Sequence, residues 1–103
     1  MKYAVLISLV AASAACVSAL PHPTEADARV AAARFDGVTL AELDVGRRSY
    51  VASCAGCHHL YLPADRPPDA WPPIVAEMSA RGSVSSADSR AIERYLVTMA
   101  SPR

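Results

Sequence analysis

The segment that most restricts the fold of this chain is Cys54-Ala55-Gly56-Cys57-His58, which has the pattern CXXCH. Two thiols three positions apart on a helical turn can each add to a vinyl group of one porphyrin. The next residue, His58, then lies under the porphyrin iron and serves as an axial ligand. Ala55 and Gly56 are small, so the porphyrin edge can approach the backbone. The motif therefore predicts one covalently attached haem, haem c.

Three other kinds of site use the same side chains. A structural zinc site would take four neighbouring ligands: Cys54, Cys57, His58 and His59. Zinc needs its ligands around a tetrahedron, whereas adjacent histidines point apart and no second Cys/His pair follows. A thioredoxin-type CXXC should follow a strand, but no segment alternates apolar and polar residues as a half-buried strand does. A simple disulfide would leave His58 unexplained.

Residues 1–19 predict an export signal, with one lysine, an apolar run and a stretch of small residues. The apolar run is shorter than the roughly 20 residues that span a bilayer. Val17-Ser18-Ala19 fits cleavage after Ala19, whereas Ser13-Ala14-Ala15-Cys16 resembles a lipoprotein signal that would make Cys16 a lipidated N-terminus. We therefore expect a periplasmic or otherwise extracytoplasmic protein that reaches a membrane only through a lipid on Cys16.

Residues 20–38 are expected to form an N-terminal lead and one short helix. The sequence Leu20-Pro-His-Pro-Thr24 suggests an unstructured tether. Thr24 and Asp27 have the spacing of a capping box, so the helix should begin there. Gly37 is a natural place for it to stop.

Residues 39–103 are expected to form the haem domain, beginning with a helix that Thr39 and Glu42 would cap. Five residues of this helix recur at steps of three or four and so share one face: Leu43, Gly46, Tyr50, Cys54 and Cys57. A glycine inside a helix costs about 1 kcal/mol relative to alanine. Gly46 therefore suggests that another helix approaches closely at this point, the alternative being a simple break in the helix.

Five prolines between Leu62 and Pro73 predict a stiff extended loop. Asp69 is the expected cap of the next helix, which Gly82 should end. Its apolar face consists of Trp71, Ile74, Val75 and Met78. A last helix should begin near Ser85 and end at Ser101-Pro102. Its apolar stripe is Ala91, Ile92, Tyr95, Leu96 and Met99. The pattern predicts an all-α fold, a bundle of three to four short helices around the haem.

Three segments, GRRSYVASCAGCHHL, AWPPIVAEM and SADSRAIERYLVTM, resemble the small mono-haem c-type cytochromes of bacteria. The resemblance covers about residues 39–100. It implies a cytochrome c-like domain in which a helix preceding CXXCH crosses a C-terminal helix. Gly46, Tyr50, Tyr95 and Leu96 match the crossing positions of that family. Many members place the methionine ligand in a loop far downstream of the histidine, whereas Met78 follows His58 by only twenty residues.

Met78 is the expected sixth ligand of the iron, because Met/His ligation is typical of electron-transfer cytochromes. Ordinary core packing is the alternative role for a methionine on an apolar stripe. Met99 is the second candidate, while His59 is too close to His58 to reach the opposite haem face. Trp71 is a candidate haem contact. A backbone carbonyl in the stretch 62–68 is expected to accept the second ring N–H of His58.

These residues predict an electron carrier, not an enzyme, that transfers one electron at a time to and from redox partner proteins. The formal net charge of zero gives no electrostatic basis for binding nucleic acid. If Met78 does not ligate, a five-coordinate haem would bind a diatomic gas or react with peroxide. A third reading is an electron-outlet subunit of a larger oxidoreductase.

Overall fold

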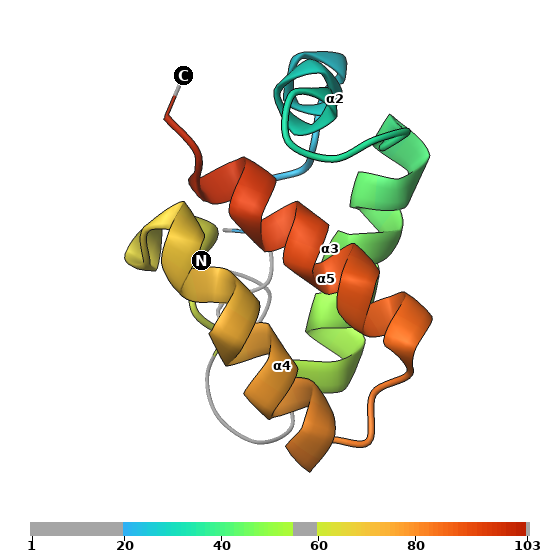
Figure 1. Cartoon of the computed structure of the whole chain (residues 1–103), viewed down its shortest axis with the longest axis vertical. Helices are drawn as coiled ribbons and strands as arrows, with labels where there is room; N and C mark the ends of the chain where they lie inside the picture. The colour runs from blue at the N-terminus through green and yellow to red at the C-terminus, as the bar shows by residue number, and fades with distance from the viewer. Residues whose placement is uncertain (1–19, 55–59, 103) are drawn as a thin grey trace, which may run out of the picture.

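The computed structural model describes residues 20–54 and 60–102, and these ranges form four α-helices and two short 3-10 turns without any strand. The predicted export signal, Cys57, His58 and His59 lie outside the described residues. The elements in chain order are α2 (Glu25–Ala32), α3 (Leu40–Cys54), η1 (Pro63–Asp65), η2 (Pro68–Ala70), α4 (Trp71–Arg81) and α5 (Ser86–Ala100). The all-α class predicted from the sequence is therefore confirmed (Figure 1).

The last helix, α5, organises the described part of the fold because it contacts α2, α3, α4 and both 3-10 turns. Its predicted stripe is buried, except that Met99 is only half-buried, and Val97 and Thr98 are buried as well. The main core forms where α5 meets α3 and α4. Its buried members are Leu20, Tyr50, Trp71, Val75, Ile92, Tyr95, Leu96 and Val97. A smaller cluster of Ala31, Val38 and Leu43 holds α2 against the start of α3.

The crossing of α3 and α5 confirms the role predicted for Gly46 (Figure 1). A Cβ atom on Gly46 would lie 2.8 Å from the Cβ of Tyr95 and would also collide with the Ala91 carbonyl. The helices can approach this closely only because the glycine has no side chain. Beside the crossing, the Tyr50 and Tyr95 rings pack with centroids 6.5 Å apart.

The starts of α2, α3 and α5 are capped by the predicted residues, although the capping box at α3 is incomplete. Thr24 and Asp27 form the complete capping box, and the Ser85 hydroxyl accepts a hydrogen bond from the Asp88 amide at 3.1 Å. At α3 the Thr39 hydroxyl accepts from the Glu42 amide at 3.2 Å. The Glu42 carboxylate turns away from the cap and accepts from Arg94 of α5 at 2.6 Å. An ion pair between helices thus replaces the second half of the predicted box.

The predicted Asp69 cap is wrong. Asp69 lies in the turn η2, Ala70 is the N-cap residue of α4, and no side chain caps this helix. Pro72 in the first turn explains why such a cap is less needed, since proline has no N–H to satisfy. The Asp69 carboxylate instead lies 3.8 Å from the Arg34 guanidinium. The extended loop predicted between Leu62 and Pro73 is likewise broken by two single 3-10 turns.

The helix ends differ in detail from the prediction. The helix α2 ends at Ala32, several residues before Gly37, which adopts a φ of 71° in the following turn. Gly82 does end α4, but with a φ of −90°. The left-handed conformation falls on the next residue, Ser83, with a φ of 54°.

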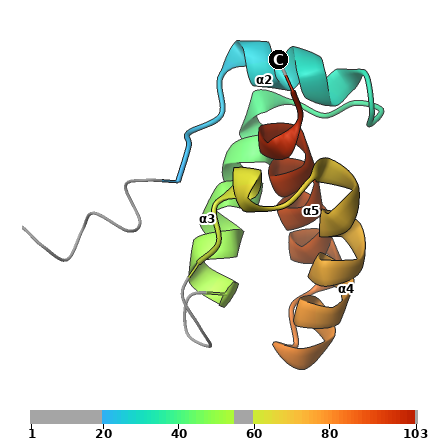
Figure 2. The same ribbon diagram turned by 90° about the vertical axis from the view of Figure 1, so that its left-hand side faces the viewer.

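The unstructured tether predicted for residues 20–24 is also wrong. Leu20 is 1% exposed and belongs to the main core. Arg47 of α3 donates a hydrogen bond to the Leu20 carbonyl at 3.3 Å, and the Tyr95 hydroxyl of α5 donates to the Pro21 carbonyl at 2.7 Å. Figure 2 shows the segment (blue) leading into α2 from the side of α3. Burial of the Leu20 side chain, which stabilises by about 1.5–3 kcal/mol, and these two hydrogen bonds together oppose the loss of backbone freedom in the segment.

Candidate functional site

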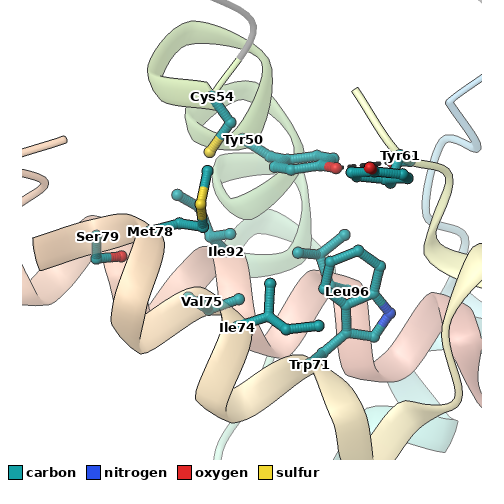
Figure 3. A pocket seen from close by; sticks show the side chains of 10 residues that line it. All are labelled: Tyr50, Cys54, Tyr61, Trp71, Ile74, Val75, Met78, Ser79, Ile92 and Leu96. Carbon is teal, nitrogen blue, oxygen red and sulfur yellow. Dashed lines mark hydrogen bonds between the residues drawn. The ribbon is translucent and has the colours of Figure 1, made fainter. Parts of the chain in front are cut away.

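A cavity with apolar walls lies between α3 and α4, with α5 as its floor (Figure 3). Its volume is about 80 Å³, and it opens to solvent. Ten side chains line it: Tyr50, Cys54, Tyr61, Trp71, Ile74, Val75, Met78, Ser79, Ile92 and Leu96. The whole apolar face predicted for the helix 71–81 therefore points into this cavity.

The structure brings together Cys54 and Met78, two of the predicted site residues. Cys54 is the last residue of α3, and Met78 lies on α4 one turn before its end. Their side chains point toward each other across the cavity, and both sulfur atoms face the same space (Figure 3). Both residues are half-buried. A thiol and a thioether from different helices thus share one apolar opening.

Met99, the second candidate for the sixth ligand, does not line the cavity. It lies near the end of α5, half-buried against the main core. His22, the one histidine among the described residues, is exposed in the N-terminal segment. Of the two downstream methionines, only Met78 is therefore placed at the opening that Cys54 shares.

Trp71, the first residue of α4, lines the cavity and is 2% exposed. Its indole N–H donates to the Pro63 carbonyl at 2.9 Å, so this donor is directed at the proline segment. The Pro63 carbonyl also receives the Arg66 amide at 3.4 Å, and the Leu62 carbonyl receives the Asp65 amide at 2.9 Å. The carbonyls at the start of the stretch 62–68 therefore already have donors. The predicted acceptor for His58 involves a residue outside the described part and stays a prediction.

Tyr50 lines the cavity from α3, and it makes a hydrogen bond that was not predicted from the sequence. Its hydroxyl donates to the Tyr61 carbonyl at 2.7 Å. Burial raises the pKa of the Tyr50 phenol well above its usual range, and negative charge at Cys54 would raise it further. The phenol is therefore a donor at any physiological pH. The Tyr61 ring in turn stacks under the Arg66 guanidinium, whose carbon lies 5.0 Å from the ring centroid.

The lining fits a haem in its chemistry, since it combines a thiol, a thioether and apolar walls. The enclosed volume of about 80 Å³ is smaller than the pockets of roughly 300–1,000 Å³ that usually hold ligands of this size. A haem in this position would therefore extend through the mouth and keep one edge toward solvent.

Groups of metal-binding side chains and membrane-spanning helices were sought in residues 20–54 and 60–102. Within these ranges, no group of three histidine, cysteine, aspartate or glutamate side chains lies close enough to hold a metal ion. None of the helices described is both long enough and apolar enough to cross a membrane.

Comparisons of the chain with family models, curated proteins and solved structures found no match.

Proposed function

We propose that this protein is a c-type cytochrome that carries single electrons by means of one covalently attached haem. The observation that carries the proposal is the position of Cys54. This first residue of the CXXCH motif ends α3 at an apolar opening, and Met78 faces it from α4. Met/His ligation of a haem c needs the CXXCH motif and a thioether that can reach the iron, and Met78 is the thioether that shares the opening with Cys54.

In this proposal, Cys54 and Cys57 would hold the haem through thioether bonds, and His58 and Met78 would ligate its iron. Once bound, the haem would supply one-electron redox chemistry. The chain contributes the rest. Val75, Ile92 and Leu96 give the cavity apolar walls, and the neutral thioether of Met78 would favour the ferrous state over the ferric.

The solvent-facing mouth of the cavity suggests how electrons would enter and leave. A haem edge at this mouth would lie close to the protein surface, where a redox partner protein can approach it. An export signal at residues 1–19, as predicted from the sequence, would put this exchange outside the cytoplasm, where attachment of haem to CXXCH takes place. The chain itself is then a carrier, whether free or part of a larger oxidoreductase.

The direct test is whether haem stays with the denatured polypeptide. The wild-type protein, matured in a periplasm, should keep its haem stain after denaturing electrophoresis and should carry the mass of one haem. The double variant Cys54→Ala/Cys57→Ala should lose both signals because no thiol remains in the motif.

Cys16→Ser is the matched control, since it removes a cysteine that lies outside the motif. Its folded domain should carry as much haem as the wild type. Complete extraction of haem from the wild-type protein by acidified organic solvent would contradict covalent attachment.

A further inference from the structure

The helix α4 carries Met78 in its last turn, and this turn is less firmly packed than the turns before it. The two buried side chains of α4 are Trp71 and Val75, which are 2% and 5% exposed. Met78 is only half-buried, and the last two residues of the helix are exposed. The core therefore holds the start of α4 more firmly than the turn that carries the thioether.

A hydrogen bond between two serine side chains joins this last turn to α5. The Ser79 hydroxyl donates to the Ser89 hydroxyl at 2.8 Å, and both residues are half-buried. Among the residues that the structure describes, it is the single side-chain hydrogen bond between α4 and α5. The backbone adds a bond at the same residue, from the Val84 amide to the Ser79 carbonyl at 2.9 Å. Ser79 is therefore the point at which the end of α4 is attached.

We propose that Ser89 is a positioning residue for the Met78 thioether, acting through its hydrogen bond to Ser79. The inference rests on the proposed function, because it assigns Met78 to the haem iron. Met78 and Ser79 are adjacent in one helical turn, so a fixed Ser79 side chain also fixes the rotation of that turn about the helix axis. The methionine side chain is flexible by itself, and a fixed backbone narrows the range of positions that its sulfur can reach.

The position of Ser89 separates this role from direct contact with the haem. Met78 and Ser79 line the cavity (Figure 3). Ser89 does not line it, and lies instead along a separate surface groove with Ala76 and Arg90. Replacing Ser89 by alanine removes the hydrogen bond and leaves every side chain of the cavity wall in place. An effect of this change on the iron has to pass through α4 or α5.

Ser101 provides a matched control at the other end of α5. Its hydroxyl donates to the Val97 carbonyl at 2.7 Å, and the residue is 8% exposed. Ser101→Ala therefore also removes one hydroxyl and one hydrogen bond, but at the C-cap of α5 and away from the cavity lining. The two variants differ mainly in whether the end of α4 is released.

The test compares Ser89→Ala with Ser101→Ala in the haem-loaded protein. Carbon monoxide should bind to ferrous Ser89→Ala about two- to tenfold faster than to the wild type, since the thioether leaves the iron more often after the loss of one net hydrogen bond. Ser101→Ala should bind carbon monoxide at the wild-type rate. Hydrogen exchange followed by mass spectrometry should show an increase of about the same size at residues 76–84 in Ser89→Ala alone.

A double-mutant cycle tests whether Ser89 acts through Ser79. If it does, adding Ser89→Ala to Ser79→Ala should not raise the rate of carbon monoxide binding any further, because the hydrogen bond is already lost.

Three results would overturn the proposal. The first is a wild-type rate in Ser89→Ala, and the second is an equal increase in Ser89→Ala and Ser101→Ala, which would indicate a general loss of rigidity. The third is an undiminished effect of Ser89→Ala in the Ser79→Ala background, which would place its route through α5. A wild-type protein without covalent haem would instead overturn the proposed function. The exchange comparison would then still decide whether Ser89 holds the last turn of α4.

Discussion

Gly46 lies directly against the backbone of Ala91 where α3 crosses α5. The contact is between the α-carbon of one helix and the main chain of the other, with no side chain between them. Any Cβ atom at position 46 would have to push the helices apart, which would disturb the placement of Tyr50 and Cys54 on α3. The position of the cavity wall formed by α3 therefore depends on the absence of a side chain at position 46.

Gly46→Ala should destabilise the protein despite the better helix propensity of alanine. Alanine gains about 1 kcal/mol over glycine inside a helix, whereas overpacking of this kind costs about 1–3 kcal/mol. We expect a net loss of unfolding free energy, measured by chemical denaturation. Gly82→Ala is the control, since a Cβ there would lie 3.3 Å from the nearest heavy atom, the Met78 carbonyl oxygen. Equal stability of both variants would argue against a close crossing.

Met78→Leu tests ligation of the iron. Leucine keeps the volume of methionine, and such swaps usually cost less than about 1.5 kcal/mol. If the thioether ligates the iron, its loss should lower the reduction potential, remove the weak sulfur-to-iron band at the red end of the ferric spectrum and open the iron to carbon monoxide. Met99→Leu alters a half-buried methionine away from the cavity and should change none of these.

A wild-type protein that is already high-spin and binds carbon monoxide rapidly would contradict ligation by Met78. It would favour gas binding or peroxide chemistry in place of electron transfer.

Trp71 is the chain's single tryptophan and lines the cavity, so its fluorescence reports directly on what the cavity holds. In the haem-loaded protein its emission should be strongly quenched by energy transfer to the porphyrin. In Cys54→Ala/Cys57→Ala the emission should recover and, if the chain stays folded, remain at the short wavelength of a buried indole. Equal emission from the two proteins would place the haem away from α4.

High pH should weaken the fold through its two buried tyrosines. Burial raises the pKa of Tyr95 to about 12, against the opposing charge of Arg47, and burial raises the pKa of Tyr50 as well. In the unfolded chain these phenols ionise near pH 10. Above that value the unfolded state binds fewer protons than the folded state, so the unfolding free energy falls as pH rises through 10 toward 12. Each tyrosine contributes at most about 1.4 kcal/mol per pH unit.

The measurement is the unfolding free energy between pH 8 and 11, determined on the wild type and on Tyr95→Phe. The variant should show a smaller fall above about pH 10, because it has one titrating phenol fewer. A flat profile in the wild type would contradict the raised pKa values.

Most features that depend on neighbouring residues could be predicted from the sequence, although the cap expected at Asp69 was not found. The capping box of Thr24 and Asp27 and the cap at Ser85 each involve residues three apart, and both are present. The buried face of α5 followed from its helical periodicity. Gly46 was recognisable because a glycine on the apolar face of a helix has few purposes other than close packing. Cys54 and Met78 each lie on the apolar face of a helix, so both side chains were expected to point into the core, where they face each other.

Features that depend on distant parts of the chain could not be predicted. The Glu42 carboxylate pairs with Arg94 instead of completing its local cap, and nothing near Glu42 in the sequence indicates that partner. The bond from Tyr50 to the Tyr61 carbonyl has no side-chain signature at its acceptor, because every residue carries a carbonyl group. Leu20 was assigned to a tether because the prolines around it suggested an extended chain, and extended chain can also be buried.

The burial of Leu20 sets how far the folded domain could stand from a membrane. Cys16 is four residues before Leu20, and an extended chain spans at most about 3.6 Å per residue, so a lipid on Cys16 would hold the core within roughly 14 Å of the bilayer surface. An electron carrier anchored this closely could reorient but could not leave the membrane surface. Its redox partners would therefore have to bind it at the membrane. Cleavage after Ala19 would have the opposite effect. The released protein would diffuse freely, and its first residue would be a core leucine with a charged amino group near the Arg47 guanidinium.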